Sequence, residues 1–417
     1  MVKNHNVQGM AKSALVIAIA LSATATYAKT EQTEIEQLRA EIQELRALIQ
    51  QQNSATIVPA QQVSNAESKA EKQPVQTGYA IQSKASTEAT VYGFVRGDVS
   101  YQAEGGKSIF NRIDDVALNG EHNDKLYSTV NTTRLGVDFK TPLAAQTLGG
   151  KIEVDLRDGG TLDSKLRLRH GYLTYDNWLI GQTTSSFSNL EVIPEMLDFN
   201  LNLGVQNDRR AMLRYSDNLS AETQFFVGLE QKSADNRLPT LTAKINQKYA
   251  EGKGIVSGRA FVEQNRAKSP QESLKTTAWG LGVGTAYQIN PTVKAFVDYS
   301  HSEGNKDMTM YSNAAFVVDA TTLENNVFDA VSLGATYLIN EKLRSTLGYG
   351  MMQAKENRFA DINQDANKTL QQGWVNMMYT PNKPMTFGVE YVYGERETFA
   401  GEKGKDNRVA AMARYSF

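Results

Sequence analysis

The sequence predicts an all-β protein whose main part is a 16-stranded antiparallel transmembrane β-barrel, preceded by a short N-terminal coiled-coil helix. Three observations lead to this prediction. From residue 90 onward apolar and polar residues alternate with a period of two, seven short turns alternate with eight long loops, and the chain ends on an aromatic residue, Phe417. An even number of strands, with short turns at one end and long loops at the other, is typical of bacterial outer-membrane barrels.

The composition excludes several other classes of protein. The 417 residues include no cysteine, which excludes disulfide frameworks and thiolate metal sites. The formal charge of −2 provides no general attraction for nucleic acid. We therefore expect no cofactor, no metal ion and no nucleic-acid partner. The histidines lack metal-ligand spacing, and they are His5, His122, His170 and His301.

Residues 1–28 form a predicted secretory signal. Lys3 and Lys12 precede an unbroken apolar run, and small residues follow it. Cleavage fits after Ala25 or after Ala28. The alternative is a transmembrane anchor helix, but the apolar run is shorter than the ~20 residues that a spanning helix needs.

Residues 29–52 are predicted to form a parallel coiled coil. Apolar residues recur at spacings of three and four, and opposite charges at the e and g positions are placed to pair across an in-register interface. The seam consists of Ile35, Leu38, Ile42, Leu45 and Ile49, with Glu34 and Glu41 at g and Arg39 and Arg46 at e. The alternative is a single amphipathic helix on a neighbouring surface. Isoleucine at a with leucine at d favours two strands over three, so the heptads leave the oligomer number open.

Residues 53–89 are predicted to be a flexible linker. The segment consists mainly of Gln, Ser, Ala, Thr and Lys, includes Pro59 and Pro74, and shows little apolar periodicity. Such a composition does not support a packed core. The barrel then occupies residues 90–417, and the N-terminal helix is expected in the periplasm.

Alternation with a period of two is clearest in six segments of the predicted barrel. Successive side chains of a strand point to opposite faces, so one set faces lipid and the other faces the interior. The first segment sets valines and glycines against Phe94, Arg96 and Asp98. The segments cover residues 91–101, 134–140, 151–157, 166–169, 280–287 and 387–394.

Turns and loops divide the barrel region into sixteen strands. A β-sandwich or a solenoid is the alternative, but neither produces a strict alternation of short and long connections. The expected turns cover residues 141–149, 176–177, 216–218, 251–254, 289–291, 339–341 and 380–384. The expected long loops lie near residues 103–128, 158–164, 183–208, 231–239, 264–276, 301–326, 353–369 and 395–407.

Closure of the sheet is expected because lipid cannot satisfy the hydrogen bonds of an open edge. The first strand, residues 91–101, is therefore predicted to pair with the last strand, residues 409–417. Aromatic residues near strand ends are expected at the level of the lipid headgroups. They are Tyr101, Tyr287, Tyr379, Tyr415 and Phe417.

Inward-facing positions of the predicted strands carry more basic than acidic residues. A barrel of sixteen strands is too wide for side chains to fill, so solutes meet these positions. The candidate substrate-binding or pore-lining residues are Arg96, Arg134, Arg157, Arg167, Arg169, Arg210, Arg214, Arg259 and Lys294. Further basic positions are Lys140, Lys151, Lys244, Arg344 and Arg396, and the acidic positions are Asp98, Asp138, Glu153, Asp155, Glu230, Glu263, Asp298 and Glu390.

This bias predicts a preference for anions. Arginine binds carboxylates bidentately, and a passage lined by one sign of charge concentrates solutes of the other sign. We expect dicarboxylates as ligands, because two basic rows can hold both ends of such a molecule. The alternative is a purely structural ladder of arginines paired to acids in the lumen.

The third long loop, residues 183–208, carries more apolar residues than a solvent-exposed loop would. Such a loop needs a wall to pack against, and the inner wall of the barrel is the nearest. Folded inward, it narrows the pore and sets acids against the arginines. The alternatives are an extracellular flap and a subunit contact. The candidate constriction residues are Phe187, Glu191, Glu195 and Asp198.

A membrane-embedded hydrolase is a further alternative, and we do not favour it. The period of two places His170 on the outward face, where catalysis would need a nucleophile beside it. Its neighbours on that face, Leu168 and Tyr172, supply none. We therefore expect no enzymatic activity, and a subunit interface or the headgroup region is the simpler environment for His170.

Four stretches of the barrel region resemble the DcaP-like outer-membrane porins. They are residues 91–98, 167–172, 181–183 and 187–199. The resemblance implies a homotrimer of sixteen-stranded barrels in the outer membrane of a Gram-negative bacterium, surrounded by lipid and lipopolysaccharide. It also implies passive uptake of small dicarboxylates such as succinate and phthalate, and of anionic β-lactamase inhibitors. A non-selective general diffusion porin is the main rival function.

Overall fold

The computed structural model describes most of the predicted barrel. The predicted signal (1–28), the predicted coiled coil (29–52) and most of the predicted linker (53–89) lie outside the described residues. In the part of the chain that is described, no helix combines the length and the apolarity needed to cross a membrane. The described residues are 79–82, 86–120, 123–143, 146–157, 164–231, 237–268, 273–319 and 321–417.

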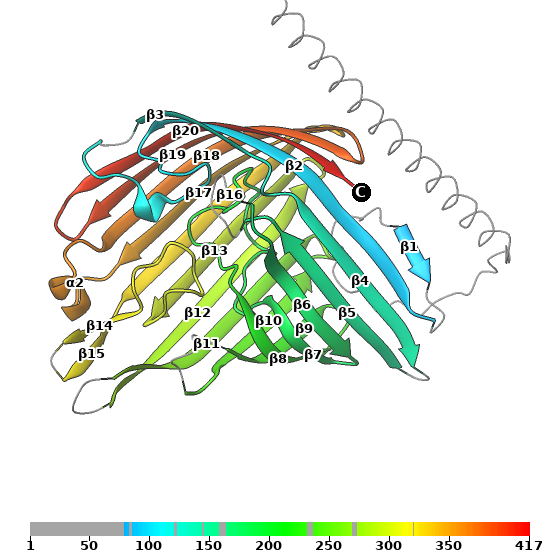
Figure 1. Cartoon of the computed structure of the whole chain (residues 1–417), viewed down its shortest axis with the longest axis horizontal. Helices are drawn as coiled ribbons and strands as arrows, with labels where there is room; N and C mark the ends of the chain where they lie inside the picture. Colours follow the sequence, from blue (N-terminus) through cyan, green and yellow to red (C-terminus); the bar gives the residue numbers. More distant parts are fainter. Residues whose placement is uncertain are drawn as a thin grey trace, which may run out of the picture. The chain divides into compact units, whose positions relative to one another are not determined.

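Antiparallel strands make up most of these residues (Figure 1). In the first half of the chain they are β1 (Tyr79–Gln82), β2 (Glu88–Glu104), β3 (Asn123–Thr129), β4 (Arg134–Leu143), β5 (Gln146–Asp155), β6 (Arg167–Tyr175), β7 (Trp178–Thr184), β8 (Arg209–Asn218), β9 (Thr223–Glu230) and β10 (Thr240–Tyr249). In the second half they are β11 (Gly254–Lys268), β12 (Ser273–Asn290), β13 (Val293–Glu303), β14 (Phe316–Asp319), β15 (Thr322–Asn325), β16 (Val327–Asn340), β17 (Leu343–Ala354), β18 (Asn367–Asn382), β19 (Met385–Thr398) and β20 (Lys403–Ser416). Loops contain the 3-10 helix η1 (Ile113–Asp115) and the helix α2 (Arg358–Ile362).

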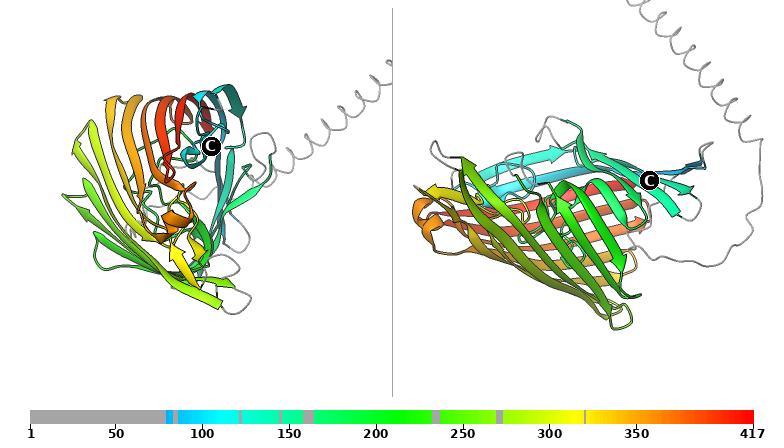
Figure 2. Two further views of the ribbon diagram at one scale, coloured as in Figure 1. Left: turned by 90° about the vertical axis from the view of Figure 1, so that its left-hand side faces the viewer. Right: turned by 90° about the horizontal axis from the view of Figure 1, so that it is seen from below.

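The strands close into one barrel with sixteen positions in the described chain (Figure 2). β3 and β4 occupy a single position, because β4 pairs with the first half of β2 and β3 with its second half. β14 and β15 form a separate hairpin, and β1 pairs only with the start of β2. The predicted 16-stranded antiparallel barrel is therefore confirmed.

The seam of the barrel lies between β2 and β20. These strands pair from Phe94 opposite Ser416 to Glu104 opposite Asn407, with one irregularity after Gln102. The backbone N–H of Gly93 donates to Phe417 O at 3.2 Å, and the N–H of Phe417 donates to Gly93 O at 3.0 Å. The last residue of the chain thus completes the ladder, as the pairing of first and last strands predicts.

The exposure of side chains on the two faces of the strands is the reverse of that in a soluble protein. Val95 and Val99 are 54% and 44% exposed, whereas Arg96 and Asp98 between them are 7% and 4% exposed. Apolar side chains on the outside and buried polar side chains inside are what a barrel in lipid requires. Among the predicted headgroup-level aromatics, Tyr101, Tyr379 and Tyr415 are exposed.

Most predicted connections are confirmed, and three long loops are shorter than predicted. β3 occupies the end of the first, which was expected over residues 103–128, and pairs with β2 from Asn123 opposite Glu104. β11 and β12 stay paired as far as Lys268 opposite Ser273, and β19 and β20 as far as Glu397 opposite Lys403. These polar segments were expected to be loops. Backbone pairing does not require apolar side chains, so a strand continues as a polar ribbon beyond the apolar band.

The sheet also begins earlier than the sequence predicts. β2 starts at Glu88, and the short β1 lies within the range expected to be linker. β1 pairs with β2 from Tyr79 opposite Val91 to Gln82 opposite Glu88. On this side of β2, β20 covers only the residues from Phe94 onward, so β1 pairs with an edge that would otherwise be open.

Candidate functional site in the barrel interior

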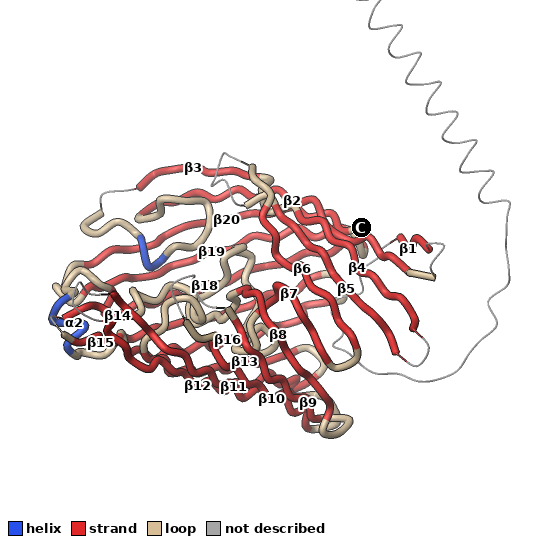
Figure 3. Tube along the Cα trace, turned by 60° about the horizontal axis from the view of Figure 1, so that its bottom comes forward, coloured by secondary structure: helices blue, strands red, loops and turns tan. Residues whose placement is uncertain are grey.

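Residues 185–208, between β7 and β8, form the third long loop, here called L3. Loop segments cross the interior of the ring of strands (Figure 3). The apolar residues of L3 lie in separate clusters, mostly with residues of the inner wall. The clusters are Phe187 with Phe261 and with Met308 of the β13–β14 loop, Val192 with Ala286 and Phe296, Met196 with Trp374 and Val392, Leu197 with Met378 and Met412, and Leu203 with Phe328 and Met352. Each fully buried aliphatic or aromatic side chain contributes about 1.5–3 kcal/mol, so these contacts hold L3 along its length.

Inward-facing glycines make room for L3. A Cβ added at Gly334 would lie 2.6 Å from Pro194 Cβ, and one at Gly388 would lie 2.7 Å from Leu197 Cδ1. The same holds for Gly284 beneath Val192 and for Gly350 beneath Leu203, at 2.6 and 2.7 Å. Real Cβ atoms do not approach so closely. Four of the glycines on the strands, Gly284, Gly334, Gly350 and Gly388, are therefore places where L3 touches the wall.

Asp198 holds L3 to the wall at β20. Its carboxylate pairs with Arg408 and accepts the backbone N–H of Asn111 at 2.8 Å. Glu390 on β19 accepts the N–H groups of Leu197 at 2.6 Å and of Asp198 at 3.0 Å. Asp198 and Arg408 are 2% and 1% exposed, so this candidate constriction acid is buried against the wall.

The other two candidate acids of L3 also pair with basic residues of the wall. Glu191 pairs with Lys244 on β10. Glu195 binds Arg344 on β17 through two hydrogen bonds of 2.7 Å, and its backbone carbonyl accepts Trp374 Nε1 at 3.0 Å. L3 is thus tied to strands on several sides of the barrel.

Five candidate arginines gather beside L3. Phe199 is surrounded by the guanidinium groups of Arg96, Arg134, Arg157 and Arg169, whose Cζ atoms lie 5.6, 5.7, 5.5 and 5.8 Å from the ring centroid. Arg167 lies next to them, and its guanidinium binds Asp155 bidentately at 2.9 and 2.7 Å. The sequence brings these arginines from β2, β4, the end of β5 and β6. We call this group the Phe199 cluster.

Three carboxylates accompany the five arginines of the Phe199 cluster. Arg169 donates to Glu153 at 2.7 Å and to Asp155 at 2.9 Å, and Arg96 donates to Asp98 at 2.9 Å. Arg157 instead donates to the neutral Asn200 Oδ1 at 3.3 Å and lies 4.4 Å from the ring centroid of Phe110. The five arginines outnumber the three carboxylates, Asp98, Glu153 and Asp155, by two.

The remaining candidate basic residues lie elsewhere on the wall. Arg259 is buried and binds Asp298 at 2.8 Å and Gln206 of L3 at 3.0 Å. Arg210 pairs with Asp208 at the end of L3, where burial raises the pKa of the Asp208 carboxyl although Arg210 opposes that shift. Arg214 Cζ lies 5.4 Å from the ring centroid of Phe226. Lys294 Nζ lies 5.1 Å from that of Phe296.

The predicted outward orientation of His170 is wrong. The pairing of β5 with β6 shifts by one residue, so Glu153 faces His170 while Val154 faces Leu168. Arg169 forms the resulting β-bulge, and the bulge reverses the parity of the residues that follow it. His170 Nδ1 lies 2.9 Å from Thr183 Oγ1, on the inner side with Glu153, and not in a lipid-facing or subunit-facing position.

Two further loops contribute residues to the barrel interior. Neither loop was predicted to do so. The loop after β2, described for residues 105–120, buries Phe110 and Ile113. In the loop between β13 and β14, Tyr311 donates to the carbonyls of Asn200 and Leu201 at 2.9 and 3.1 Å. Burial raises the pKa of the Tyr311 phenol well above its ordinary value, so it remains a donor. The only sequence signal was a few apolar residues within otherwise polar loops.

The arginines of β20 were also not among the candidates. Arg408 and Arg414 have the inward parity of the last strand, opposite Gln102 and Arg96 of β2. Arg408 is buried with Asp198 and Asp406. Arg414 Cζ lies 5.7 Å from the ring centroid of Phe94. The alternation of the last strand was sufficient to identify both residues as inward-facing.

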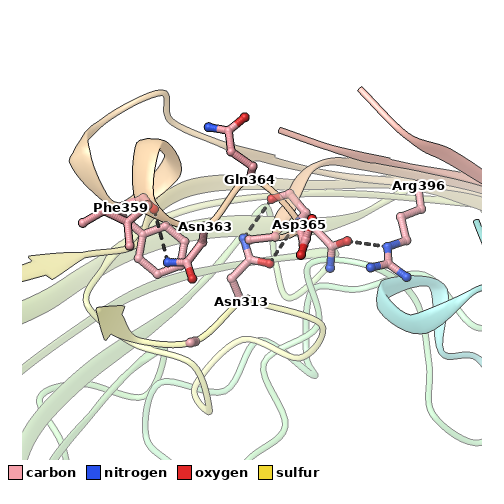
Figure 4. A pocket seen from close by; sticks show the side chains of 10 residues that line it. Asn313, Phe359, Asn363, Gln364, Asp365 and Arg396 are labelled. Atoms are coloured by element: carbon pink, nitrogen blue, oxygen red, sulfur yellow. Dashed lines mark hydrogen bonds between the residues drawn. The ribbon is translucent and has the colours of Figure 1, made fainter. Parts of the chain in front are cut away.

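A separate hollow of about 490 Å³ lies among the loops at the long-loop end of the barrel (Figure 4). Its polar side chains bond to one another and to the backbone: Arg396 donates to Asn367 Oδ1 at 2.6 Å, and Asn363 donates to the backbone carbonyl of Phe359 at 3.2 Å. Asn313 and Asn367 exchange two further hydrogen bonds. Because these groups already have partners, we place the functional site in the barrel interior and not here.

No group of three or more His, Asp or Glu side chains in the described chain is placed to hold a metal ion. The candidate site therefore consists of charged and aromatic side chains around L3. Such an arrangement binds solutes by hydrogen bonds and charge, and by contact with aromatic faces.

Comparison with known proteins agrees with this architecture. Residues 19–417 match the family described as DcaP outer membrane protein. The crystal structure of the outer membrane channel DcaP of Acinetobacter baumannii is 44% identical, covers 81% of this chain and 99% of its own, and superposes with a TM-score of 0.77. No curated protein sequence matches the chain.

More distant structures share the fold alone. An anion-selective porin from Comamonas acidovorans is 13% identical, covers 79% of this chain and 100% of its own, and has a TM-score of 0.54. OmpF of Salmonella typhi, solved with daunomycin, is 16% identical, covers 81% and 100%, and has a TM-score of 0.54. The chain therefore belongs to the DcaP outer membrane protein family and is a porin-type channel of the outer membrane of a Gram-negative bacterium.

Proposed function

We propose that this channel prefers anions and admits small dicarboxylates, and that L3 narrows its passage beside the Phe199 cluster. The observation that carries the proposal is the excess of two positive charges in that cluster. Arg157 and Arg134 supply the excess, because the other three arginines bind the three carboxylates directly. Arg157 pairs with no carboxylate of the cluster, and Arg134 only shares Glu153 with Arg169, at 3.4 Å. Guanidinium groups that are not neutralised by a carboxylate are available to an incoming one.

Other charged groups weigh less in this proposal. Arg408 with Asp198 and Asp406 carries a net negative charge, but all three side chains are buried where L3 meets β20. Arg210, Arg259 and their acids form the structural ladder that we considered as an alternative. We therefore attribute anion selectivity to the Phe199 cluster, and we attribute to the buried ion pairs the role of holding L3 against the wall.

A salt gradient across a planar bilayer tests the proposed preference. With the purified full-length protein, the reversal potential is expected to show greater permeability for chloride than for potassium, and succinate is expected to interrupt the current. Cation preference or equal permeability, together with uninterrupted current in succinate, would instead support a general diffusion channel. Phthalate and anionic β-lactamase inhibitors serve as further solutes in the same assay.

We also propose that the channel is a homotrimer in lipid and lipopolysaccharide, assisted by residues 29–52 in the periplasm. Short helices are marginal alone, and barrels that already associate raise the effective concentration of their coiled-coil segments. Deletion of residues 29–52 is expected to weaken the trimer in detergent, as measured by light scattering. Unchanged trimers would contradict the assembly role proposed for that segment.

A further inference from the structure

A second aromatic ring faces two arginines inside the barrel. Phe94 lies two residues before Arg96 on β2. The Cζ atoms of Arg134 and Arg414 lie 5.1 and 5.7 Å from its ring centroid. Arg134 is opposite Phe94 across the β2–β4 pair, and Arg414 is opposite Arg96 across the β2–β20 pair. The two guanidinium groups thus approach one ring from both neighbouring strands.

These guanidinium groups retain hydrogen-bonding capacity. The Nε atoms of Arg134 and Arg414 are buried without a hydrogen-bond partner in the described part of the chain. Arg414 Nη2 reaches only Thr386 Oγ1, at 3.5 Å. The carboxylate oxygen that pairs with Arg134, Glu153 Oε1, is 3.4 Å from its Nε. Because these Nε atoms are themselves buried, an incoming carboxylate would bind the Nη groups of the two half-buried side chains.

Arg96 shows the contrast. It has the same inward orientation, but its Nε and Nη2 donate to Asp98, and Nη2 also donates to the carbonyl of Leu197 at 2.7 Å. The guanidinium of Arg96 therefore fixes L3 to β2. Those of Arg134 and Arg414 are not used in this way.

Phe94 lies on the short-turn side of L3. Its partner across the seam, Ser416, donates its N–H to Pro384 O in the turn between β18 and β19, at 2.7 Å. L3 crosses β2 two residues further on, where Leu197 accepts from Arg96. Short turns of such barrels face the periplasm. A solute that passes L3 from outside therefore meets Phe94 after Phe199.

Arg134 belongs to both aromatic groups. Its Cζ atom is 5.1 Å from the ring centroid of Phe94 and 5.7 Å from that of Phe199. One side chain from β4 thus connects the Phe199 cluster with the ring on the other side of L3. Conduction through several adjacent sites of moderate affinity is faster than conduction through a single strong one.

We propose that Arg134, Arg414 and Phe94 form a second carboxylate-binding site on the periplasmic side of L3. In this site each guanidinium group offers one carboxylate position beside the Phe94 ring, and the ring contacts the carbon skeleton of the solute. Arg134 transfers the carboxylate from the Phe199 cluster to Arg414. The proposal rests on the proposed function and adds a second binding step, with named residues, to it.

Single-channel block by succinate, added to one chamber at a time, tests this site. If two binding sites lie on opposite sides of L3, succinate added to one chamber blocks the channel with a different dissociation constant from succinate added to the other. Arg414→Gln is expected to weaken block from one chamber about tenfold, the effect of one lost charged hydrogen bond, and to change block from the other less than twofold. Arg414→Lys is expected to restore part of the loss because it keeps the charge.

Lys294→Gln is the matched control. It removes one inward positive charge at the same short-turn end of the barrel, where Lys294 near the start of β13 lies against Phe296, and is expected to change block from either chamber less than twofold. One-sided weakening in Arg414→Gln alone supports the second site. Equal weakening from both chambers, no weakening, or the same pattern in the control overturns it while leaving anion preference intact. A wild-type channel that succinate does not block from either chamber overturns both proposals.

Discussion

Arg157 offers the sharpest test of the Phe199 cluster. It follows β5, lies 4.4 Å from the ring centroid of Phe110 and 5.5 Å from that of Phe199, and donates to Asn200 at 3.3 Å. Its guanidinium makes no side-chain ion pair with a carboxylate in the described chain, so the substitution Arg157→Gln uncovers no buried acid. A hydrogen bond from a charged group contributes about 1.5–3 kcal/mol. Loss of one such bond to a carboxylate solute therefore weakens binding by about tenfold to about hundredfold.

The assay is single-channel block by succinate, with the reversal potential in a potassium chloride gradient measured on the same channels. Arg157→Gln reduces the positive excess of the cluster from two to one, so the reversal potential is expected to shift towards smaller anion preference. The shift is expected to shrink at high salt, because the Debye length falls from about 10 Å at 0.1 M to about 3 Å at 1 M. Block and reversal potential both equal to those of the wild type would refute the assignment of selectivity to this cluster.

Arg157→Lys separates charge from shape. The lysine keeps the positive charge but lacks the planar group that binds carboxylates bidentately and stacks on aromatic rings. The reversal potential is expected to stay near the wild-type value while succinate block weakens. Equal loss of both properties would indicate that the substitution displaces Phe110 and Phe199, and that the effect of Arg157 is indirect.

Three further predictions concern the support of this site. Replacing Arg167 and Arg169 together by Gln is expected to weaken succinate block by about 1–3 kcal/mol per lost charged hydrogen bond. Because their carboxylate partners remain, the reversal potential is also expected to move towards cation preference. Unchanged block and reversal potential would place the ligand elsewhere. Gly334→Val is expected to displace L3, because the new side chain overlaps its proline, and to change the conductance; an unaltered conductance contradicts the proposed packing. Asp198→Asn leaves Arg408 with an incomplete set of partners and is expected to destabilise the barrel by about 3–5 kcal/mol. The measurement is the temperature of the heat-induced shift in gel mobility, which is expected to fall. An unchanged temperature argues against the role assigned to this pair.

Local patterns were sufficient for the architecture. A strand repeats every two residues, so alternation such as Val95–Arg96 identifies both the strand and its inward face without knowledge of the partner strand. Closure followed from the need to satisfy the edges of the sheet in lipid, and the pairing of Gly93 with Phe417 confirms it. The predicted loop lengths were less accurate, because a polar sequence that continues two paired strands forms a β-ribbon as readily as a loop.

The interior required long-range information. The outward prediction for His170 failed because one extra residue, Arg169, shifts the parity of a strand, and a bulge leaves no reliable mark in the sequence. Asp198 was expected to face solute, but its partner Arg408 follows it by 210 residues, and their burial depends on how L3 packs. The glycines beneath L3 were visible, but their role was not, because a glycine does not indicate which side chain fills the space above it.

The sequence by itself determined the barrel, its closure and the sign of its inward charges, because these depend on the period of two and on the absence of water in lipid. The tertiary structure alone decided which arginines are neutralised, which remain available around Phe199 and Phe94, and where L3 crosses the barrel. Those features depend on contacts between residues far apart in the chain, and only the closed barrel brings such residues within a few ångströms of one another.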